Sequence, residues 1–117
     1  MFSRPFHLNQ QPVNETEGVS SRILAYSPGL LAMEWHFANK NSLTPLHNHY
    51  HEQLTCIQKG SVKVTMADGS EEVFTAGESV YFAPYEDHAV LTLEDDVVVI
   101  DVFNPCRIDH LEKHKLK

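Results

Sequence analysis

The 117-residue sequence predicts an all-β fold, a small sandwich or barrel, on three observations. Short runs rich in β-branched and aromatic residues recur about every 8–12 residues with turn signals between them. Within several runs apolar and polar residues alternate, as they do in strands with one buried face. Only residues 108–117 suggest a helical period, and that segment is short and charged.

The chain is expected to form one domain over residues 1–117, because its length is that of a single ordinary domain. Residues 1–20 are polar and predict an N-terminal arm with little regular structure that folds over a neighbouring subunit. Residues 105–117 are expected to form a C-terminal tail that holds a weak helix or a frayed end.

The clearest strand is 31–37, where four apolar residues alternate with polar ones. Asp68-Gly69 lies between two alternating runs and predicts a hairpin with a type I′ turn, which needs positive φ. Pro84 ends a strand because proline cannot donate to the ladder. The expected strands are 21–26, 31–37, the histidine-rich stretch 47–53, 54–57, 62–66, 73–74, 80–82, 88–93 and 97–103.

The composition argues against several classes of partner. The formal net charge is -7, and no stripe of lysine or arginine is present, which counts against nucleic acid and against an anionic membrane. No apolar run is long enough to span a bilayer, and no secretory signal is found. Cys56 and Cys106 are far apart and form no CxxC motif, so we expect a reducing, cytoplasmic setting.

A cluster of histidines predicts a metal site. His47, His49 and His51 alternate, and Gln53 continues the row, so in an extended strand all four side chains would point to one face. Imidazole suits first-row divalent metals, and an amide oxygen is a weaker ligand. His88, which opens a strand directly after a turn, supplies a remote further ligand. The alternatives are a solvated histidine-rich loop or a lid that only forms hydrogen bonds.

Two stretches resemble the motifs of the cupin family. Residues 47–60 read His-x-His-x3-Gln-x6-Gly, as in the first motif, and residues 77–88 resemble the second. Ala83 and Tyr85 stand where the second motif has proline and glycine. The resemblance implies a single-domain double-stranded β-helix (jelly roll). It also implies a divalent metal (Ni, Zn, Mn, Fe or Co) bound by four ligands, His47, His49, Gln53 and His88.

That ligand set places His51 at the mouth of the site or behind a ligand, with a direct metal ligand as the alternative. Because Gln53 is neutral where many cupins have glutamate, the metal would keep its full positive charge. Such a metal would attract a small anionic substrate into an otherwise acidic protein.

Asp101 lies within a strand of apolar residues, where a carboxylate is costly unless it is paired. Desolvation would raise its pKa toward the range of a useful general acid or base; the alternative is a carboxylate that caps a neighbouring strand. Arg107 could clamp a carboxylate through two hydrogen bonds, or lie at the surface.

Residues 101–109 resemble the C-terminal segment of KdgF-type pectin-degradation cupins. That resemblance implies a non-redox enzyme that opens the ring of 4,5-unsaturated monouronates to linear keto sugar acids. It also implies a homodimer, as in many cupins. It makes Asp101 the acid/base and Phe103 a wall of the substrate pocket. Arg107 is expected to bind the sugar acid and to take part in catalysis with Asp101. An Fe(II)-dependent cupin dioxygenase and a non-catalytic module that binds a sugar acid remain the alternatives. Trp35, Phe37, Tyr81 and Phe82 are assigned to the core or to a dimer contact, and His36 to the surface or to an interface.

Overall fold

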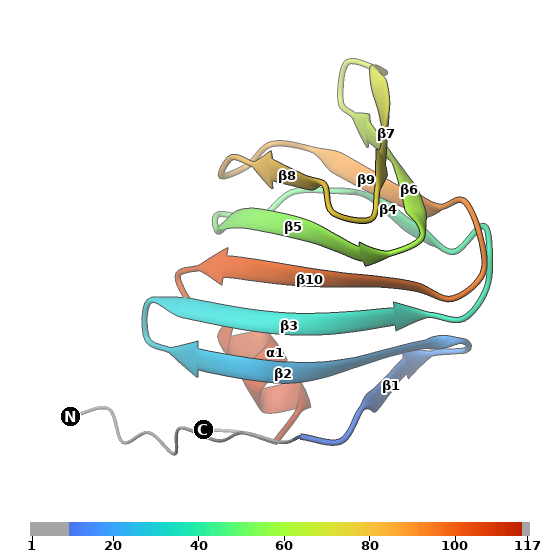
Figure 1. The fold of residues 1–117 in the computed structure, drawn as a ribbon. Coiled ribbons are helices and arrows are strands. Elements are labelled where there is room, and N and C mark those ends of the chain that lie inside the picture. The colour runs from blue at the N-terminus through green and yellow to red at the C-terminus, as the bar shows by residue number, and fades with distance from the viewer. Residues whose placement is uncertain (1–9, 116–117) are drawn as a thin grey trace.

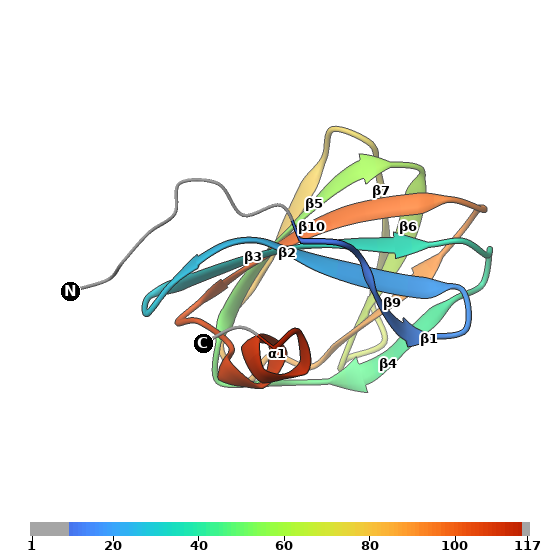
Figure 2. The ribbon, with the colours of Figure 1, turned by 90° about the horizontal axis from the view of Figure 1, so that it is seen from below.

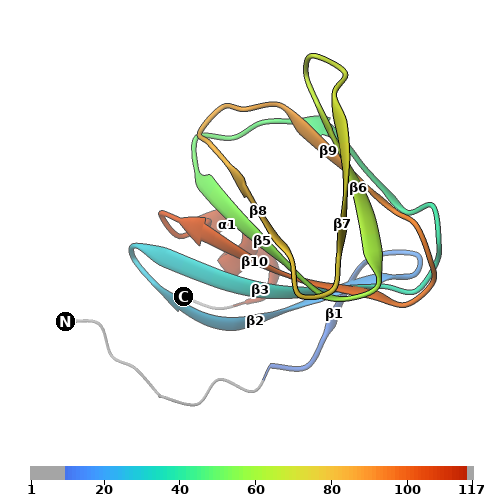
Figure 3. The same cartoon turned by 45° about the horizontal axis from the view of Figure 1, so that its top comes forward.

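The computed structural model describes residues 10–115, which form two antiparallel sheets and one short helix. The six-stranded sheet has the order β1-β2-β3-β10-β5-β8, and the four-stranded sheet has the order β4-β9-β6-β7. The sheets curve around a common interior (Figure 1, Figure 3), which confirms the predicted all-β jelly roll. The elements are β1 Val13–Thr16, β2 Val19–Ser27, β3 Leu30–Phe37, β4 Leu43–His47, β5 Glu52–Lys59, β6 Ser61–Met66, β7 Glu71–Thr75, β8 Ser79–Phe82, β9 His88–Thr92, β10 Val97–Asn104 and α1 Ile108–Lys113.

The N-terminal expectation is wrong for part of the arm. β1 pairs with β2 in an antiparallel hairpin, and β2 already begins at Val19. In β1 the inward positions are Val13 and Glu15, and the charge of Glu15 hides the two-residue period from sequence inspection. Residues 1–9 of the arm and 116–117 of the tail lie outside the described residues.

The histidine-rich stretch is not one strand. β4 ends at His47, residues 48–51 form a loop, and β5 begins at Glu52. The sequence did not predict β4, which contains Pro45 at a break in its register with β9. Proline cannot donate a ladder hydrogen bond, and this is where the pairing is interrupted.

The hairpin between β6 and β7 is confirmed, but its turn is of another kind. Within it only Gly69 has a positive φ, of 85°. The Gly69 N–H donates to the Met66 carbonyl, and the Met66 N–H donates to the Ser70 carbonyl, both at 2.9 Å. The connection is therefore a three-residue loop with glycine at the left-handed position, not a two-residue type I′ turn.

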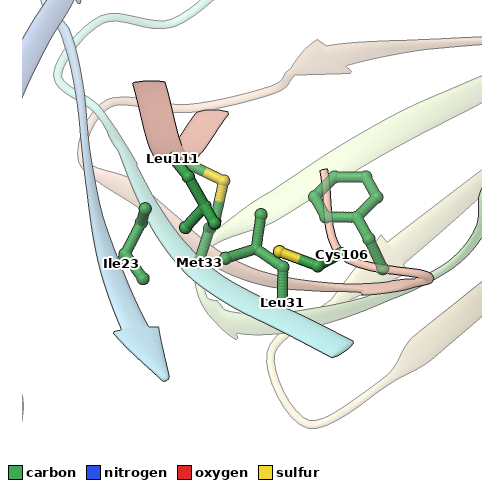
Figure 4. Close-up of a cluster of buried hydrophobic side chains, with 6 residues drawn as sticks. Ile23, Leu31, Met33, Cys106 and Leu111 are labelled. Atoms are coloured by element: carbon green, nitrogen blue, oxygen red, sulfur yellow. The ribbon is translucent and has the colours of Figure 1, made fainter. Parts of the chain in front are cut away.

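Two apolar clusters hold the fold together. One lies between the two sheets and comprises Ile57, Val62, Val64, Phe82, Val97 and Val99. The other packs α1 against the inner faces of β2 and β3 (Figure 2, Figure 4); it comprises Ile23, Leu31, Met33, Phe103, Cys106 and Leu111. Cys56 and Cys106 are both free thiols. No helix within residues 10–115 is long and apolar enough to cross a membrane.

The C-terminal helix is also fixed by polar contacts to the first strands. The His114 side chain contacts Gln10 through Nδ1 at 2.8 Å and the Ser21 hydroxyl through Nε2 at 3.0 Å. Lys113 Nζ lies 2.6 Å from Glu15 Oε1. These contacts keep α1 docked beside the interior, where its first turn becomes part of the site described next.

Candidate metal centre

Three histidines converge at one end of the barrel. His47 is the last residue of β4 and His88 the first of β9, and the two are cross-strand partners. His49 lies in the loop between β4 and β5. One ring nitrogen from each residue lies within 4.8 Å of the other two, as required of three ligands to one ion. The loop, rather than strand alternation, makes the rings converge.

The hydrogen bonds of the rings leave the inner nitrogens as acceptors. The Nδ1 atoms of His47, His49 and His88 lie 2.9, 2.9 and 2.8 Å from the carbonyls of Pro45, His51 and Glu86. A carbonyl only accepts, so each Nδ1 carries hydrogen and each Nε2 offers a lone pair. The buried His88 Nε2 has no partner within the described residues, and burial lowers the pKa of His88.

Gln53 completes the donor set. Its Oε1 lies 2.9 Å from His49 Nε2, while its Nε2 donates to the Thr55 hydroxyl at 2.9 Å and to Asp101 Oδ1 at 3.2 Å. Two lone-pair atoms, the His49 nitrogen and the Gln53 oxygen, thus face each other, and a cation between them would remove the conflict. The residues therefore fit a divalent metal, and a protonated His49 is the other way to satisfy this contact.

The loop geometry depends on Tyr85, which stands where the cupin motif has glycine. Tyr85 adopts a φ of 61°, the left-handed conformation that glycine adopts most readily. Its N–H donates to the His49 carbonyl at 2.7 Å, and its side chain is exposed. The backbone shape of the motif is thus kept without the glycine, and the histidine loop stays attached to the turn before His88.

Asp101 lies next to this cluster on the inward face of β10, opposite Thr55 of β5. Thr55 Oγ1 donates to Asp101 Oδ1 at 2.6 Å, which leaves the other carboxyl oxygen for a further partner. Desolvation raises the pKa of Asp101 to about 6, against the opposing hydrogen bonds from Thr55 and Gln53. A carboxyl group with such a pKa can exchange a proton near neutral pH.

Arg107 and Phe103 form the adjoining wall. The guanidinium lies 5.0 Å from the centre of the Phe103 ring. It holds the carboxylate of Asp109 through Nη2 at 2.9 Å and Nε at 3.3 Å. The carboxylate clamp that the sequence predicted thus exists here as a contact within the chain. The Phe103 ring in turn lies 5.8 Å from that of His49.

A cavity of about 490 Å³ joins these groups. Its lining includes His47, Gln53, His88, Asp101, Phe103 and Arg107, so the structure brings together the residues that the sequence singled out. His49 reaches the same place through its contact with Gln53. Of the other histidines, His51 is buried and holds His49 through its carbonyl. His36 lies at the surface, 3.3 Å from Asp96.

Thr55 and His110 are among the lining residues that sequence reasoning missed, and Trp35 was assigned only to the core or to a dimer contact. Thr55 has no motif of its own, and only its two-residue spacing from Gln53 could have indicated that it faces inward. His110 lies on α1 and is buried, with a pKa lowered to about 4 by burial and by Arg107. Trp35 lines the cavity and meets the His110 ring edge-on at 5.9 Å.

Comparisons with known proteins agree with this geometry. Residues 33–103 match the family model described as "Cupin domain". The pectin degradation protein KdgF of Dickeya dadantii is 30% identical over 95 residues, which cover 81% of this chain and 86% of the relative. The structure of KdgF from Halomonas sp. superposes with a TM-score of 0.82 at 26% identity, covering 87% of this chain and 94% of the other. An RmlC-like cupin from Shewanella frigidimarina gives 0.82 at 27% identity, covering 92% and 96%.

Proposed function

The chain belongs to the cupin family, and we propose that it is an enzyme that opens the ring of 4,5-unsaturated monouronates from pectin or alginate, without redox chemistry. Relatives that are similar to this chain over most of its length include a pectin degradation protein, and this supports a role in pectin breakdown. The observation that carries the chemistry is the Gln53 side chain. It faces His49 with its oxygen and donates to Asp101 with its nitrogen, so it links a metal site to a proton donor.

The metal would be held by His47, His49, Gln53 and His88. A bound dication would supply positive charge that orients and stabilises an acidic substrate. Arg107, which lines the cavity, would bind the substrate carboxylate in place of Asp109. Phe103 would form the wall against which the sugar ring packs.

Asp101 would act as the general acid. Its proton moves to C4 of the unsaturated ring, a water oxygen adds to C5, and the proton that this water loses returns to the Asp101 carboxylate. The proton of the new C5 hydroxyl then passes to the ring oxygen as the bond between C5 and that oxygen breaks. This leaves a ketone at C5 and a hydrated aldehyde at C1, which loses water to give the linear keto sugar acid. Thr55 and Gln53 hold Oδ1, so the transferred proton belongs on Oδ2.

The test is an assay of the purified protein with unsaturated galacturonate, combined with elemental analysis of its metal. We expect the alkene absorbance to disappear faster than in the spontaneous reaction. No acceleration by the metal-loaded protein would refute the proposal. Turnover only with Fe(II) and with consumption of oxygen would indicate the dioxygenase instead, and tight binding without turnover the binding module.

The homodimer, the lack of a nucleic-acid or membrane partner and the cytoplasmic setting remain predictions of the sequence. Light scattering coupled to size-exclusion chromatography measures the molar mass and so tests the homodimer directly. A monomer at micromolar concentration would contradict it.

A further inference from the structure

Two buried polar atoms in the cavity wall have no role in the reaction proposed above. Trp35 Nε1 and His110 Nδ1 have no hydrogen-bond partner within residues 10–115, and both residues line the cavity. A buried polar atom without a partner costs about 1–3 kcal/mol, so folded proteins leave few of them. Two further such atoms are His88 Nε2, which the metal cluster explains, and His51 Nδ1, whose residue does not line the cavity.

The two unexplained residues lie together in the cavity wall. On the sheet Trp35 pairs with Val99, one inward position along β10 from Asp101 and away from Phe103. Two residues of a strand span about 7 Å. His110 approaches from α1, and its ring lies 5.9 Å from that of Trp35 and 5.8 Å from that of Phe103. Trp35 therefore lies beyond Asp101 on the side away from Phe103, and His110 lies between Trp35 and Phe103.

The chemistry of the pair suits a hydroxyl group. The indole N–H of Trp35 only donates. His110 is neutral at physiological pH, because burial and Arg107 lower its pKa to about 4, so one ring nitrogen can accept. A hydroxyl both accepts and donates, and can satisfy both atoms at once. A carboxylate would find no positive charge on this pair, and Glu15 and Glu17 line the same cavity.

We propose that Trp35 and His110 form a subsite that binds a ring hydroxyl of the sugar acid, while its carboxylate lies at the Arg107 and metal end. This subsite rests on the proposed function for its substrate class. It would fix the direction in which the ring enters and so place C4 beside Asp101. The two residues bind and orient the substrate and do not exchange its protons.

A binding role and a structural role predict opposite results. If the two atoms bind a ligand, they are unpaired in the ligand-free protein and lower its unfolding free energy. An apolar replacement then leaves the ligand-free protein equally stable or makes it more stable. The same replacement weakens binding of the ligand. If the atoms stabilise the fold through internal water, replacement lowers stability and leaves binding unchanged.

The experiment uses His110→Phe and Trp35→Phe in the metal-loaded protein, with D-galacturonate, which has no alkene to react, as the probe. Calorimetry should show binding weakened roughly fivefold to tenfold in each variant. The thermal midpoint without the sugar should be unchanged or higher, and the metal content unchanged. His110→Asn, which keeps a polar atom near the Nδ1 position, should bind more tightly than His110→Phe. His36→Asn, at the surface, should bind as the wild type does.

Unchanged galacturonate binding in both phenylalanine variants, with lower thermal midpoints, would overturn the subsite. Trp35→Phe decides the question if His110→Phe does not fold. Weakened binding in a protein that opens no unsaturated ring would refute the proposed reaction and retain the subsite. Normal ring opening with an unchanged KM in both variants would refute the subsite alone.

Discussion

β5 and β10 run side by side, and the character of their inward faces changes along their length. At one end, Gln53 and Thr55 of β5 meet Phe103 and Asp101 of β10 beside the histidines. At the other end, Ile57 pairs with Val99 in the cluster between the sheets. The same backbone ladder continues through both. Two successive inward residues per strand are thus enough to change a packed core into the polar wall of the candidate site, and the core end holds the polar end in register.

The largest expected effect falls at the polar end. Asp101→Asn keeps the shape of the side chain but cannot donate the proton that the proposed mechanism assigns to Asp101, so the rate of alkene loss should fall by roughly 10²- to 10⁴-fold. Metal content and far-ultraviolet circular dichroism serve as controls and should not change. Full activity in this variant would remove Asp101 from the mechanism.

At the apolar end the effect should be on stability instead. Ile57→Ala removes a side chain that is 1% exposed and should cost about 2–5 kcal/mol of unfolding free energy, measured by urea denaturation. Turnover per folded molecule should stay within about twofold. A stable but inactive Ile57→Ala protein would show that the two ends are not separable.

In metal-free protein, Asp101→Asn should also change how the unfolding free energy depends on pH. The folded pKa of Asp101 is about 6 against 3.8 for the free side chain, so the wild type loses stability as the pH rises through 6. Asparagine has no proton to lose, and the variant should gain up to about 3 kcal/mol relative to wild type above pH 6. Below pH 4 the gain should disappear. Equal stability curves from pH 4 to 8 would contradict the raised pKa.

Gln53→Glu tests the link between the metal site and the acid. A glutamate would face Asp101 with an anion in place of an N–H donor now 3.2 Å away, and the pKa of Asp101 should rise further. It would also reduce the net charge of the metal site, and we expect roughly a 10- to 100-fold loss of activity. The pH profile of kcat/KM measures the first effect. A profile that moves to lower pH would refute this arrangement.

The smallest effect is expected from Thr55. Thr55→Val removes the hydrogen bond at 2.6 Å that lowers the pKa of Asp101, so the alkaline limit of activity should move to higher pH, by less than in Gln53→Glu. Thr55→Ser keeps the hydroxyl and should restore the wild-type profile. A loss of rate at every pH without a shift would mean that Thr55 only fills space.

The comparison also shows which parts of the molecule local sequence could predict. The alternation of β3 and the two-residue spacing of His47 and His49 are local patterns. His88 lies far along the chain, and its position after a turn and the resemblance to the second cupin motif added it to the cluster. β4 was missed because it is defined by pairing with β9, far along the chain, and is interrupted by a proline. Strand alternation predicted a row of histidines, whereas the three rings converge because His47 ends β4, His49 lies in the loop at 48–51 and His88 begins β9.

His110 and Thr55 were missed for a different reason. Neither carries a motif, and their roles depend on what faces them across the interior. His110 reaches the cavity only because α1 docks on β2 and β3, and that docking depends on contacts between segments about a hundred residues apart, such as Gln10 and His114. Contacts between segments so far apart in the chain cannot be predicted from local periodicity.

The place of β10 in the sheet has a consequence for the order in which the site can assemble. β10 lies between β3 and β5, although both precede it in the chain. As the ribosome releases the polypeptide, the residues of the metal cluster emerge before Asp101, Arg107 and His110. Until β10 inserts, the edges of β3 and β5 that it will join stay unpaired and can attach to other nascent strands. One late insertion thus closes the barrel and brings Asp101 to the candidate site, so a chain halted before β10 begins at Val97 would have neither.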